Sequence, residues 1–433
     1  MIDQGQHFLL DRRIFIVGGT ALFAATGSPL RAAATDGNRL FADVDAYARL
    51  GEHRTGTKVD VATSKWISRR LRAFGMSVKR TPFDIRVFEP TKGELRIEES
   101  APLATFPVWP PIVTPAGGLS AQLTPTGRRG GIAVVTLPYT PNASLLTSAY
   151  ADPIAAAVAG GAAAVIGITE GPTGEIIALN AVPDRHRWPV PVALSAGRDG
   201  ARLTAAAARG LRANLRQEGR SRDSCAYNIV ASRPGTGPAL VISTPTSGWF
   251  NCAGERGAGV ALFLALAEWS AKTIMRPVIF VATSGHEIEG RGSEHALGGL
   301  PPPSQVGGWL HLGANLAGAD VTFANGRVQR QAGAFTQRGA RASQSLLPIV
   351  AQSFAGVQGY SSPQPLQPSN AVGDIAHYAK AGYHPILGLV AAHPLHHTRL
   401  DVAQNVTSPE LLAELLPPLK RVLIALASQE TRL

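Results

Sequence analysis

Cysteine, aromatic residues and long apolar runs are all scarce in this sequence. Only 2 of its 433 residues are cysteine, and aromatic residues make up 6%. Two cysteines exclude the disulfide framework of a small secreted fold, although Cys225 and Cys252 could form one bridge in an oxidising compartment. Beyond the N-terminal region, no segment is long and apolar enough to span a bilayer. A chain of this length is expected to form two lobes.

Acidic residues are also in deficit, with 30 Asp and Glu against 41 Lys and Arg, which gives a formal net charge of +11. Binding of nucleic acid would need a concentrated basic stripe with aromatic side chains for base stacking. Here the arginines are scattered along the chain. We therefore interpret the excess charge as a solvated basic surface and expect no nucleic-acid partner.

Residues 1–34 have the pattern of an export signal. Arg12-Arg13 precede a moderately apolar stretch, Ile14 to Leu30, and Ala32-Ala33-Ala34 offer a small-residue cleavage site. The paired arginines favour the twin-arginine route. The alternative, a membrane anchor, is disfavoured because the apolar stretch is short and interrupted by Gly and Pro. We expect a periplasmic or secreted protein that begins near Thr35 and has no stable membrane insertion.

Alternating apolar and turn-forming segments predict an α/β fold. Residues 40–75 have helical spacing that stops at Gly75, a strand follows, and residues 98–128 are rich in Pro and Gly. Between residues 130 and 210, short alanine-rich helices alternate with short apolar strands, as in a compact inserted domain. We therefore predict a main domain of residues 35–99 and 223–433, with residues 100–222 as an insert.

The second half of the chain predicts the core of the main domain. Residues 227–245 indicate two neighbouring strands joined by a Pro-Gly turn. Such a hairpin would return Cys225 and Cys252 to the same end, where a bridge is geometrically possible; the alternative is two buried free thiols. "GAGVALFLALAEWSA" predicts a buried helix, "RPVIFVATSG" a central strand, and Ser408-Pro409 the start of the last helix. The whole predicts a mixed, mostly parallel sheet sandwiched between helices, with a smaller α/β insert.

Ionisable side chains gather where the predicted strands end, which is where open α/β sheets carry their sites. Glu255 follows one strand, and His286-Glu287 follow the next. Adjacent carboxylates and imidazoles at one sheet edge are typical of a zinc site. Two further strand ends carry Asn315 and the group His393, His396, His397 and Asp401.

The order of these pieces resembles the co-catalytic zinc exopeptidase family, which includes the bacterial leucyl aminopeptidases, glutamate carboxypeptidase and the transferrin receptor. "GERGAGVALFLALA" resembles the family's Asp-Asn helix start, and "GHEIEGRGS" resembles its Glu-Glu…Gly-Ser turn. "GDIAHYAKAGYHPIL" and "HHTRLD" resemble its last two segments. The resemblance covers nearly all of residues 37–433. It implies the exopeptidase fold, with a protease-associated domain as the insert.

The chain departs from this family at several metal-binding positions. Two ligand positions are intact, Glu287 and His397. Pro245 stands where the family has its first His ligand, and Ser247 stands where it has the Asp two residues later. Glu255 replaces the metal-bridging Asp, and Arg256 replaces the Asn beside it. His286 replaces the catalytic Glu, and Asn315 replaces a later Asp ligand.

These departures fall mainly on one of the family's two metals. Proline offers no side-chain ligand and an amide is a poor one, so the metal assigned to Pro245, Glu255 and Asn315 is expected to be lost. The second metal would keep Glu255, Glu287 and His397, so the resemblance implies one zinc ion at most, or none. Losing a dication leaves buried anions uncompensated. Arg256 could replace that charge, point to solvent, or pair with Glu255 and withdraw it from the second metal.

His286 is open to three interpretations. It could act as a general base, remain at the strand end without a role, or close the metal site as a fourth ligand. We expect Asp401 to orient His397 and Asp374 to cap the turn before "YAKAG". Solvated or loop positions are expected for Glu289, Glu294, His295, His393 and His396, although either of the last two could replace His397.

Two functions follow from this pattern. The first is an exported hydrolase of terminal peptide or amide bonds, in which metal-bound water attacks while His286 takes its proton. The alternative is a metal-free pseudoenzyme that binds a peptide or protein without turnover, as the transferrin receptor illustrates for this fold. The expected partner is a peptide or small amide in either case.

Overall fold

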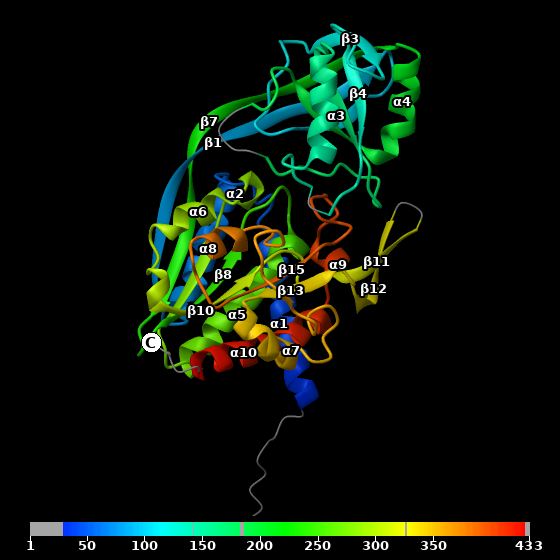
Figure 1. Cartoon of the computed structure of the whole chain (residues 1–433). Coiled ribbons are helices and arrows are strands. Elements are labelled where there is room, and N and C mark those ends of the chain that lie inside the picture. Colours follow the sequence, from blue (N-terminus) through cyan, green and yellow to red (C-terminus); the bar gives the residue numbers. More distant parts are fainter. Residues whose placement is uncertain (1–28, 142, 182–185, 325–326, 429–433) are drawn as a thin grey trace, which may run out of the picture.

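The computed structural model describes residues 29–141, 143–181, 186–324 and 327–428, and these residues form two lobes (Figure 1). Arg12-Arg13 and most of the expected export signal lie outside the described residues. The predicted cleavage site after Ala34 falls within helix α1 (Pro29–Ala48). Within the described ranges, no helix combines the length and the apolar character needed to cross a membrane.

Helices and strands alternate along only part of the chain. After α1, the helices are α2 (Lys58–Ala73), α3 (Ser148–Ala159), α4 (Gly200–Ala208), α5 (Ala258–Thr273), α6 (Arg291–Leu297), α7 (Leu347–Ser353), α8 (Ile375–Lys380), α9 (Ala403–Val406) and α10 (Pro409–Ser428). The strands are β1 (Ser77–Ile97), β2 (Leu103–Pro107), β3 (Leu119–Thr124), β4 (Ile132–Leu137), β5 (Ala164–Thr169), β6 (Val192–Ala196), β7 (Arg212–Arg233), β8 (Ala239–Pro245), β9 (Val278–Thr283), β10 (Val306–Leu312), β11 (Ala319–Ala324), β12 (Arg327–Ala334), β13 (Arg338–Ala342), β14 (Gln364–Pro365) and β15 (Ile386–Ala391). Helices and strands alternate from β8 to β10 and again from β13 to α9, whereas β1 to β4 and β10 to β13 follow one another without an intervening α-helix.

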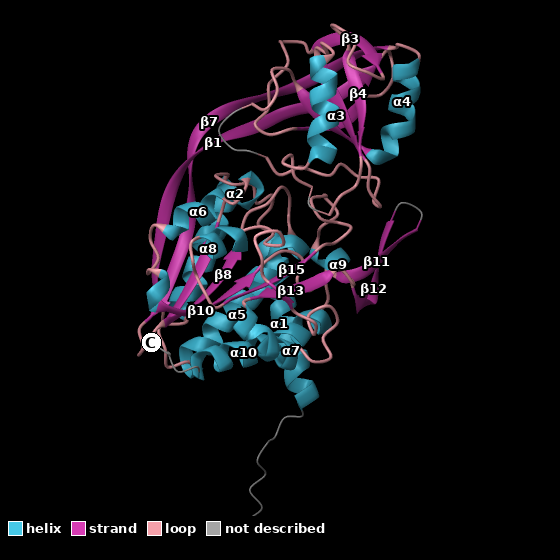
Figure 2. Ribbon diagram, viewed as in Figure 1, coloured by secondary structure: helices cyan, strands magenta, loops and turns pink. Residues whose placement is uncertain are grey.

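The main lobe is a sandwich of the predicted kind. Its strands run in the order β1-β7-β9-β8-β10-β15-β13-β14, and β8 is parallel to both of its neighbours. Successive residues of β8 enter different cores, because side chains alternate across a sheet. Leu240 and Ile242 pack on the side of α1, α5 and α10, whereas Ala239 and Val241 pack on the side of α6 and α8. Figure 2 shows these helices on the two faces.

The predicted hairpin at residues 227–245 is wrong. Both strands exist, but β9 lies between β7 and β8. The reason is that β8, α5 and β9 form a parallel crossover unit, which places β9 beside β7. Both cysteines are free, with Cys225 3.4 Å from Asp84 Oδ1 and Cys252 buried beyond the end of β8. No Cys225–Cys252 bridge is present.

The predicted helix at residues 40–75 is divided into α1 and α2. Between them runs a loop in which Gly51 and Gly56 have φ values of 121° and 73°, conformations that other residues rarely adopt. This break matters for the site, because the loop carries His53 and Thr55 into the main lobe.

The upper lobe, at the top of Figure 1, contains β2 to β6 with α3 and α4. It is built on the C-terminal half of β1 and the N-terminal half of β7. These two long strands pair antiparallel along their length, with a register shift between Pro90 and Lys92. The order β1-β2-β6-β5-β4-β3-β7 closes into a ring, because β1 also pairs with β7. Helices α3 and α4 complete this lobe (Figure 1). The boundaries at residues 100 and 222, and the protease-associated identity of the insert, stay predictions.

Candidate functional site

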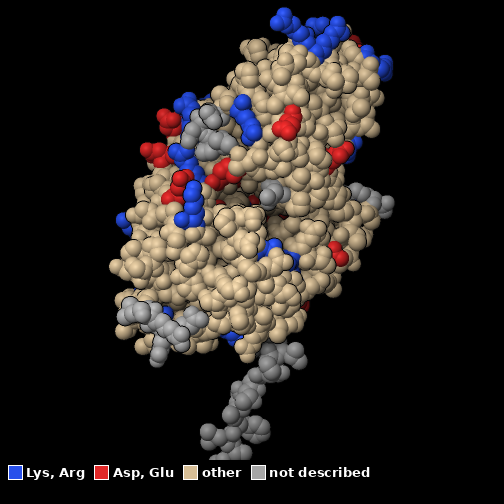
Figure 3. Space-filling model, viewed as in Figure 1, with Lys and Arg blue, Asp and Glu red and all other residues tan. Residues whose placement is uncertain are grey.

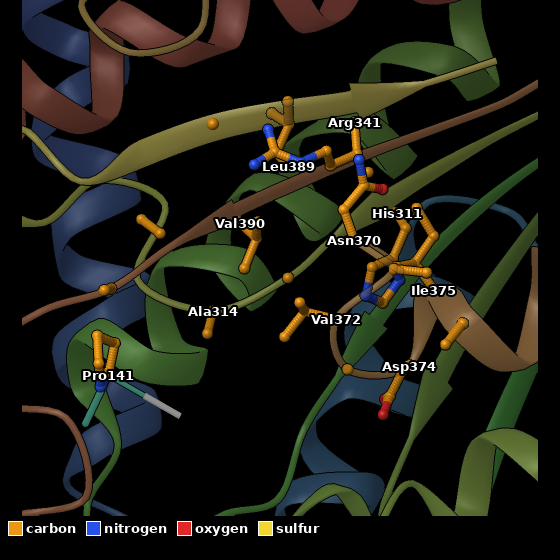
Figure 4. A pocket seen from close by; sticks show the side chains of 18 of the residues that line it. Pro141, His311, Ala314, Arg341, Asn370, Val372, Asp374, Ile375, Leu389 and Val390 are labelled. Carbon is orange, nitrogen blue, oxygen red and sulfur yellow. The ribbon is translucent and has the colours of Figure 1, made fainter. Parts of the chain in front are cut away.

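A pocket of ≈ 940 Å³ lies between the two lobes. The upper lobe contributes Pro141, Ser144 and Asn180 to its wall, and the main lobe contributes most of the rest. In Figure 4, Pro141 stands on one side of the pocket and Val372, Asp374 and Ile375 on the other. Figure 3 shows a hollow between the lobes on a face where acidic and basic side chains are interspersed.

His286 and Asp374 form a hydrogen-bonded pair in this pocket. Gly285, with φ 88°, turns the chain sharply after β9 and sends His286 into the short helical turn His286–Ile288. His286 Nδ1 lies 2.9 Å from Asp374 Oδ1, and Thr283 Oγ1 donates to the other carboxylate oxygen. Burial by itself would raise the pKa of Asp374, but the charge of His286 and this hydrogen bond outweigh burial and lower it.

This pairing corrects the expectation for Asp374. The residue does stand at the N-cap position of α8, but its side chain makes no capping hydrogen bond there. The carboxylate turns to His286 instead, because α8 begins directly opposite the end of β9. The sequence gives little signal for this contact, since 88 residues separate the two.

Glu287 is buried and held by two hydrogen bonds. Its Oε1 accepts from Thr55 N at 2.6 Å, and its Oε2 accepts from Ser247 Oγ at 2.7 Å. Ser247 Oγ also accepts from Gly285 N at 2.8 Å and His286 N at 3.2 Å. At a position where the family resemblance places an acidic side chain, Ser247 therefore organises the turn that carries His286.

Glu255, Arg256 and His397 form a fully buried charged group. Arg256 Nη2 donates to Glu255 Oε1 at 2.6 Å, and His397 Nε2 lies 3.2 Å from the same oxygen. Burial alone would raise the pKa of Glu255, but Arg256 and His397 hold it well below its usual range. Of the three options for Arg256, the structure has the pair with Glu255.

Asn315 and His396 lie beside this charged group. The amide nitrogen of Asn315 donates to Ala391 O and, at 3.1 Å, to His396 Nδ1. The His396 ring stacks on His397 with 3.8 Å between centroids and 22° between planes. Burial, and then the charge of His397, lower the pKa of His396 well below its usual value.

A group of potential metal ligands is present, but it is not the predicted set. Glu255, His396 and His397 offer ligand atoms that all lie within 4.8 Å of one another. Glu255 and His397 were predicted ligands, and His396 was a weighed substitute. Glu287 is not in this group, because both of its oxygens are turned to Thr55 and Ser247.

As arranged, these residues do not fit a metal ion. His397 Nδ1 donates to the Ala178 carbonyl, and its Nε2 lies 3.2 Å from Glu255 Oε1, so this nitrogen is engaged with the carboxylate. His396 Nδ1 accepts from Asn315. Two rings stacked face to face also cannot both point a nitrogen at one ion at the Zn–N distance of about 2.0–2.1 Å. Arg256 Nη2 also lies 2.6 Å from Glu255 Oε1, so a positive charge is already paired with the carboxylate that a metal ion would use.

Asp401 does not orient His397, in contrast to the prediction. Its two oxygens accept from Gly254 N at 2.6 Å and Glu255 N at 3.1 Å. Burial raises the pKa of Asp401 to about 7, although these backbone hydrogen bonds act in the opposite direction. Asp401 thus fixes the backbone of the turn that carries Glu255, while Ala178 orients His397.

The other candidate residues lie at the edge of the site or outside it. Pro245 ends β8 and lines the pocket. His393 is buried, donates to Ala319 O through Nε2, and has a pKa lowered to about 4 by burial. Glu289 accepts from Ser144 Oγ at 2.8 Å, a contact between the lobes. Glu294 and His295 are exposed on α6, as predicted.

Several contacts from the upper lobe reach the site and could not be read from the sequence. His397 Nδ1 donates to Ala178 O at 2.8 Å, and Trp249 Nε1 donates to Asn180 Oδ1 at 3.0 Å. Ala181 N donates to Glu287 O at 3.0 Å. The segment 178–181 has no chemical motif, so only the folded arrangement of the lobes reveals its role.

The described residues adopt a zinc-exopeptidase-like α/β fold. No family model and no curated protein matches the sequence. The structure is similar to a peptidase M28 precursor from Shewanella amazonensis (17% identity, 93% of this chain and 97% of that chain, TM-score 0.71). It is also similar to a zinc aminopeptidase from Bacillus subtilis (15%, 90% and 94%, 0.68) and to an aminopeptidase from Aneurinibacillus (16%, 90% and 93%, 0.63). These similarities confirm the predicted fold.

Proposed function

We propose that this chain hydrolyses terminal peptide or amide bonds in the pocket between the lobes, with His286 as the general base. The observation that carries the proposal is the 2.9 Å contact of His286 Nδ1 with Asp374 Oδ1 in the pocket wall. The ionised Asp374 accepts from Nδ1–H, which leaves a lone pair on Nε2. The similarity in fold to aminopeptidases supports this reaction class.

In the proposed reaction His286 first accepts a proton from water and later returns it to the leaving group. His286 Nε2 takes a proton from water, and the water oxygen attacks the acyl carbon. The C–N bond then breaks as His286 returns the proton to the leaving nitrogen, which yields a carboxylic acid and an amine. Asp374 keeps the ring oriented and stabilises its charged form. No step passes through a metal ion, because the residues present do not fit one.

Turnover of a panel of aminoacyl 4-nitroanilides tests this proposal. We expect His286→Ala to lower kcat by about 10²–10⁴-fold, the range for loss of a general base, and Asp374→Asn to lower it as well. The exposed His186, replaced by Ala, is the matched control and should leave turnover unchanged. Activity should persist after dialysis against a chelator. Chelator-sensitive activity that zinc restores would instead support the single-zinc hydrolase.

A metal-free binding scaffold is the second candidate, and the buried Glu255–Arg256 pair favours it because this pair already neutralises the altered site. It predicts peptide binding in the same pocket with no turnover by the wild-type protein.

We also propose, from the N-terminal pattern, that the protein acts after export. N-terminal sequencing of exported material should then begin near Thr35.

A further inference from the structure

Arg256 is a buried cation in the wall of the pocket. It lies in the helical turn Ala253–Gly257 between β8 and α5, and its side chain is 0% exposed. A guanidinium group always carries its charge and offers five N–H donors. The hydrogen-bond partners of its three nitrogen atoms therefore show which donors are already used and which are open to a ligand.

One of the three nitrogen atoms is left without a partner. Nε donates to Ser247 O at 2.9 Å, and Nη2 donates to Glu255 Oε1 at 2.6 Å. Nη1 is buried and has no hydrogen-bond partner among the described residues, and the same holds for Glu255 Oε2. Buried donors are nearly always satisfied, so Nη1 is a charged donor that an atom entering the pocket can complete.

Arg256 and His286 are positioned by the same residue. The Ser247 carbonyl accepts from Arg256 Nε, and the Ser247 hydroxyl accepts from His286 N. Both side chains line the pocket. A substrate whose scissile amide bond lies beside His286 can therefore have its acyl oxygen near the Arg256 guanidinium.

We propose that Arg256 Nη1 donates a hydrogen bond to the acyl oxygen of the bound substrate, and so supplies the positive charge that a metal ion supplies in zinc exopeptidases. This inference rests on the proposed function. When water attacks, the C=O electron pair moves onto the oxygen. Arg256 stabilises that anion without giving up a proton. The ligand class is an acyl compound or its tetrahedral, anionic analogue.

An aminoalkyl phosphonate tests the inference, because its charged oxygens imitate the oxyanion. We expect Arg256→Ala to weaken phosphonate binding in calorimetry at least about tenfold and to lower kcat by about 10²–10³-fold, with a much smaller change in KM. Arg220→Ala is the matched control, because Arg220 is 82% exposed and lies outside the pocket wall. It should change neither quantity.

Removing one member of a buried ion pair can unfold a protein. The double variant Glu255→Gln/Arg256→Met, which removes both charges at similar volume, is therefore measured as well. Loss of phosphonate binding in a folded variant supports the inference. Binding and turnover within about twofold of wild type in either folded variant would overturn it. Wild-type protein that binds the phosphonate through Arg256 without turning over any anilide would contradict the His286 reaction, but would support the oxygen site at Arg256.

Discussion

Single residues decide which chemistry this site can perform. The sequence allowed Glu255, Arg256, His286 and His397 to be selected, because each falls within a recognisable segment after a strand. It could not show which of these groups hydrogen-bond to one another. Ser247 illustrates the difference, because its small hydroxyl joins Glu287, Gly285 and His286 in one network. The neighbours that decide these roles come from distant parts of the chain.

His53, in the loop after α1, predicts a pH dependence of stability. Its Nε2 donates to Tyr47 O at 3.0 Å, and its ring stacks on Tyr47 with 3.8 Å between centroids. Burial lowers the pKa of His53 to about 3. Because the unfolded pKa is about 6.5, the unfolded state binds the proton first as the pH falls. The contribution of His53 to stability is therefore lost as the pH decreases from about 6.5 toward 3.

His53→Gln keeps a donor for Tyr47 O but cannot titrate. We expect this change to reduce the slope of unfolding free energy against pH by about 1 kcal/mol per unit between about pH 4.5 and 6. Denaturant titrations at several pH values measure the slope. The other buried acids and histidines are present in both proteins, so their effects cancel. A slope equal to that of wild type would show that His53 is not the group responsible.

Among the elements, those with strong apolar patterns were predicted best. The buried helix α5, the central strand β9 and the last helix α10 all lie where the sequence placed them. Pairing was predicted less well, because periodicity reports which face of a strand is buried but not which strand lies beside it. The β7–β8 hairpin failed for this reason. β7 also begins well before residue 227, where the sequence placed its start, since the first half of β7 pairs with β1 in a second lobe.

Gly292, in the first turn of α6, predicts a steric limit on the turn that carries His286. A Cβ at this position would overlap the carbonyl oxygen of Ser284, which belongs to the backbone and cannot easily move away. We expect Gly292→Ala to destabilise the protein by about 2–3 kcal/mol, as overpacking does, and to lower activity by displacing His286. Thermal unfolding and anilide turnover measure the two effects.

Gly298 offers the matched control, because it follows the same helix and its added Cβ would have no atom closer than 3.9 Å. Gly298→Ala should change stability by no more than about 0.5 kcal/mol. Equal stabilities for the two variants would contradict the close packing of α6 against the end of β9.

At the level of the whole molecule, the site depends on contact between the lobes. Trp249 and Phe250 of the main lobe belong to the same hydrophobic cluster as Phe106 and Trp109 of the upper lobe. Ala178 then reaches His397 across this interface. Two lobes were predictable from chain length and composition. Their docking was not, because the sequence does not show which apolar residues of the insert face outward.

The folding of the upper lobe by itself can be tested with two fragments that differ only at the start. The lobe has an internal core that includes Leu95, Ile97, Leu103 and Leu215. Residues 100–222 lack the first two, together with the β1 segment that pairs with both β2 and β7. We therefore expect residues 91–222 to melt cooperatively, since a ring of paired strands around its own core can fold alone.

Residues 100–222 should be less stable than residues 91–222 by several kcal/mol, because burying each large apolar side chain contributes about 1.5–3 kcal/mol. Circular dichroism melts of both fragments beside the full chain measure this difference. Both fragments should melt below the full chain, because Phe106 and Trp109 lose their packing against Trp249. Equal melts for the two fragments would show that the far half of β1 contributes nothing to the lobe, and would restore the boundary at residue 100 that the sequence predicts.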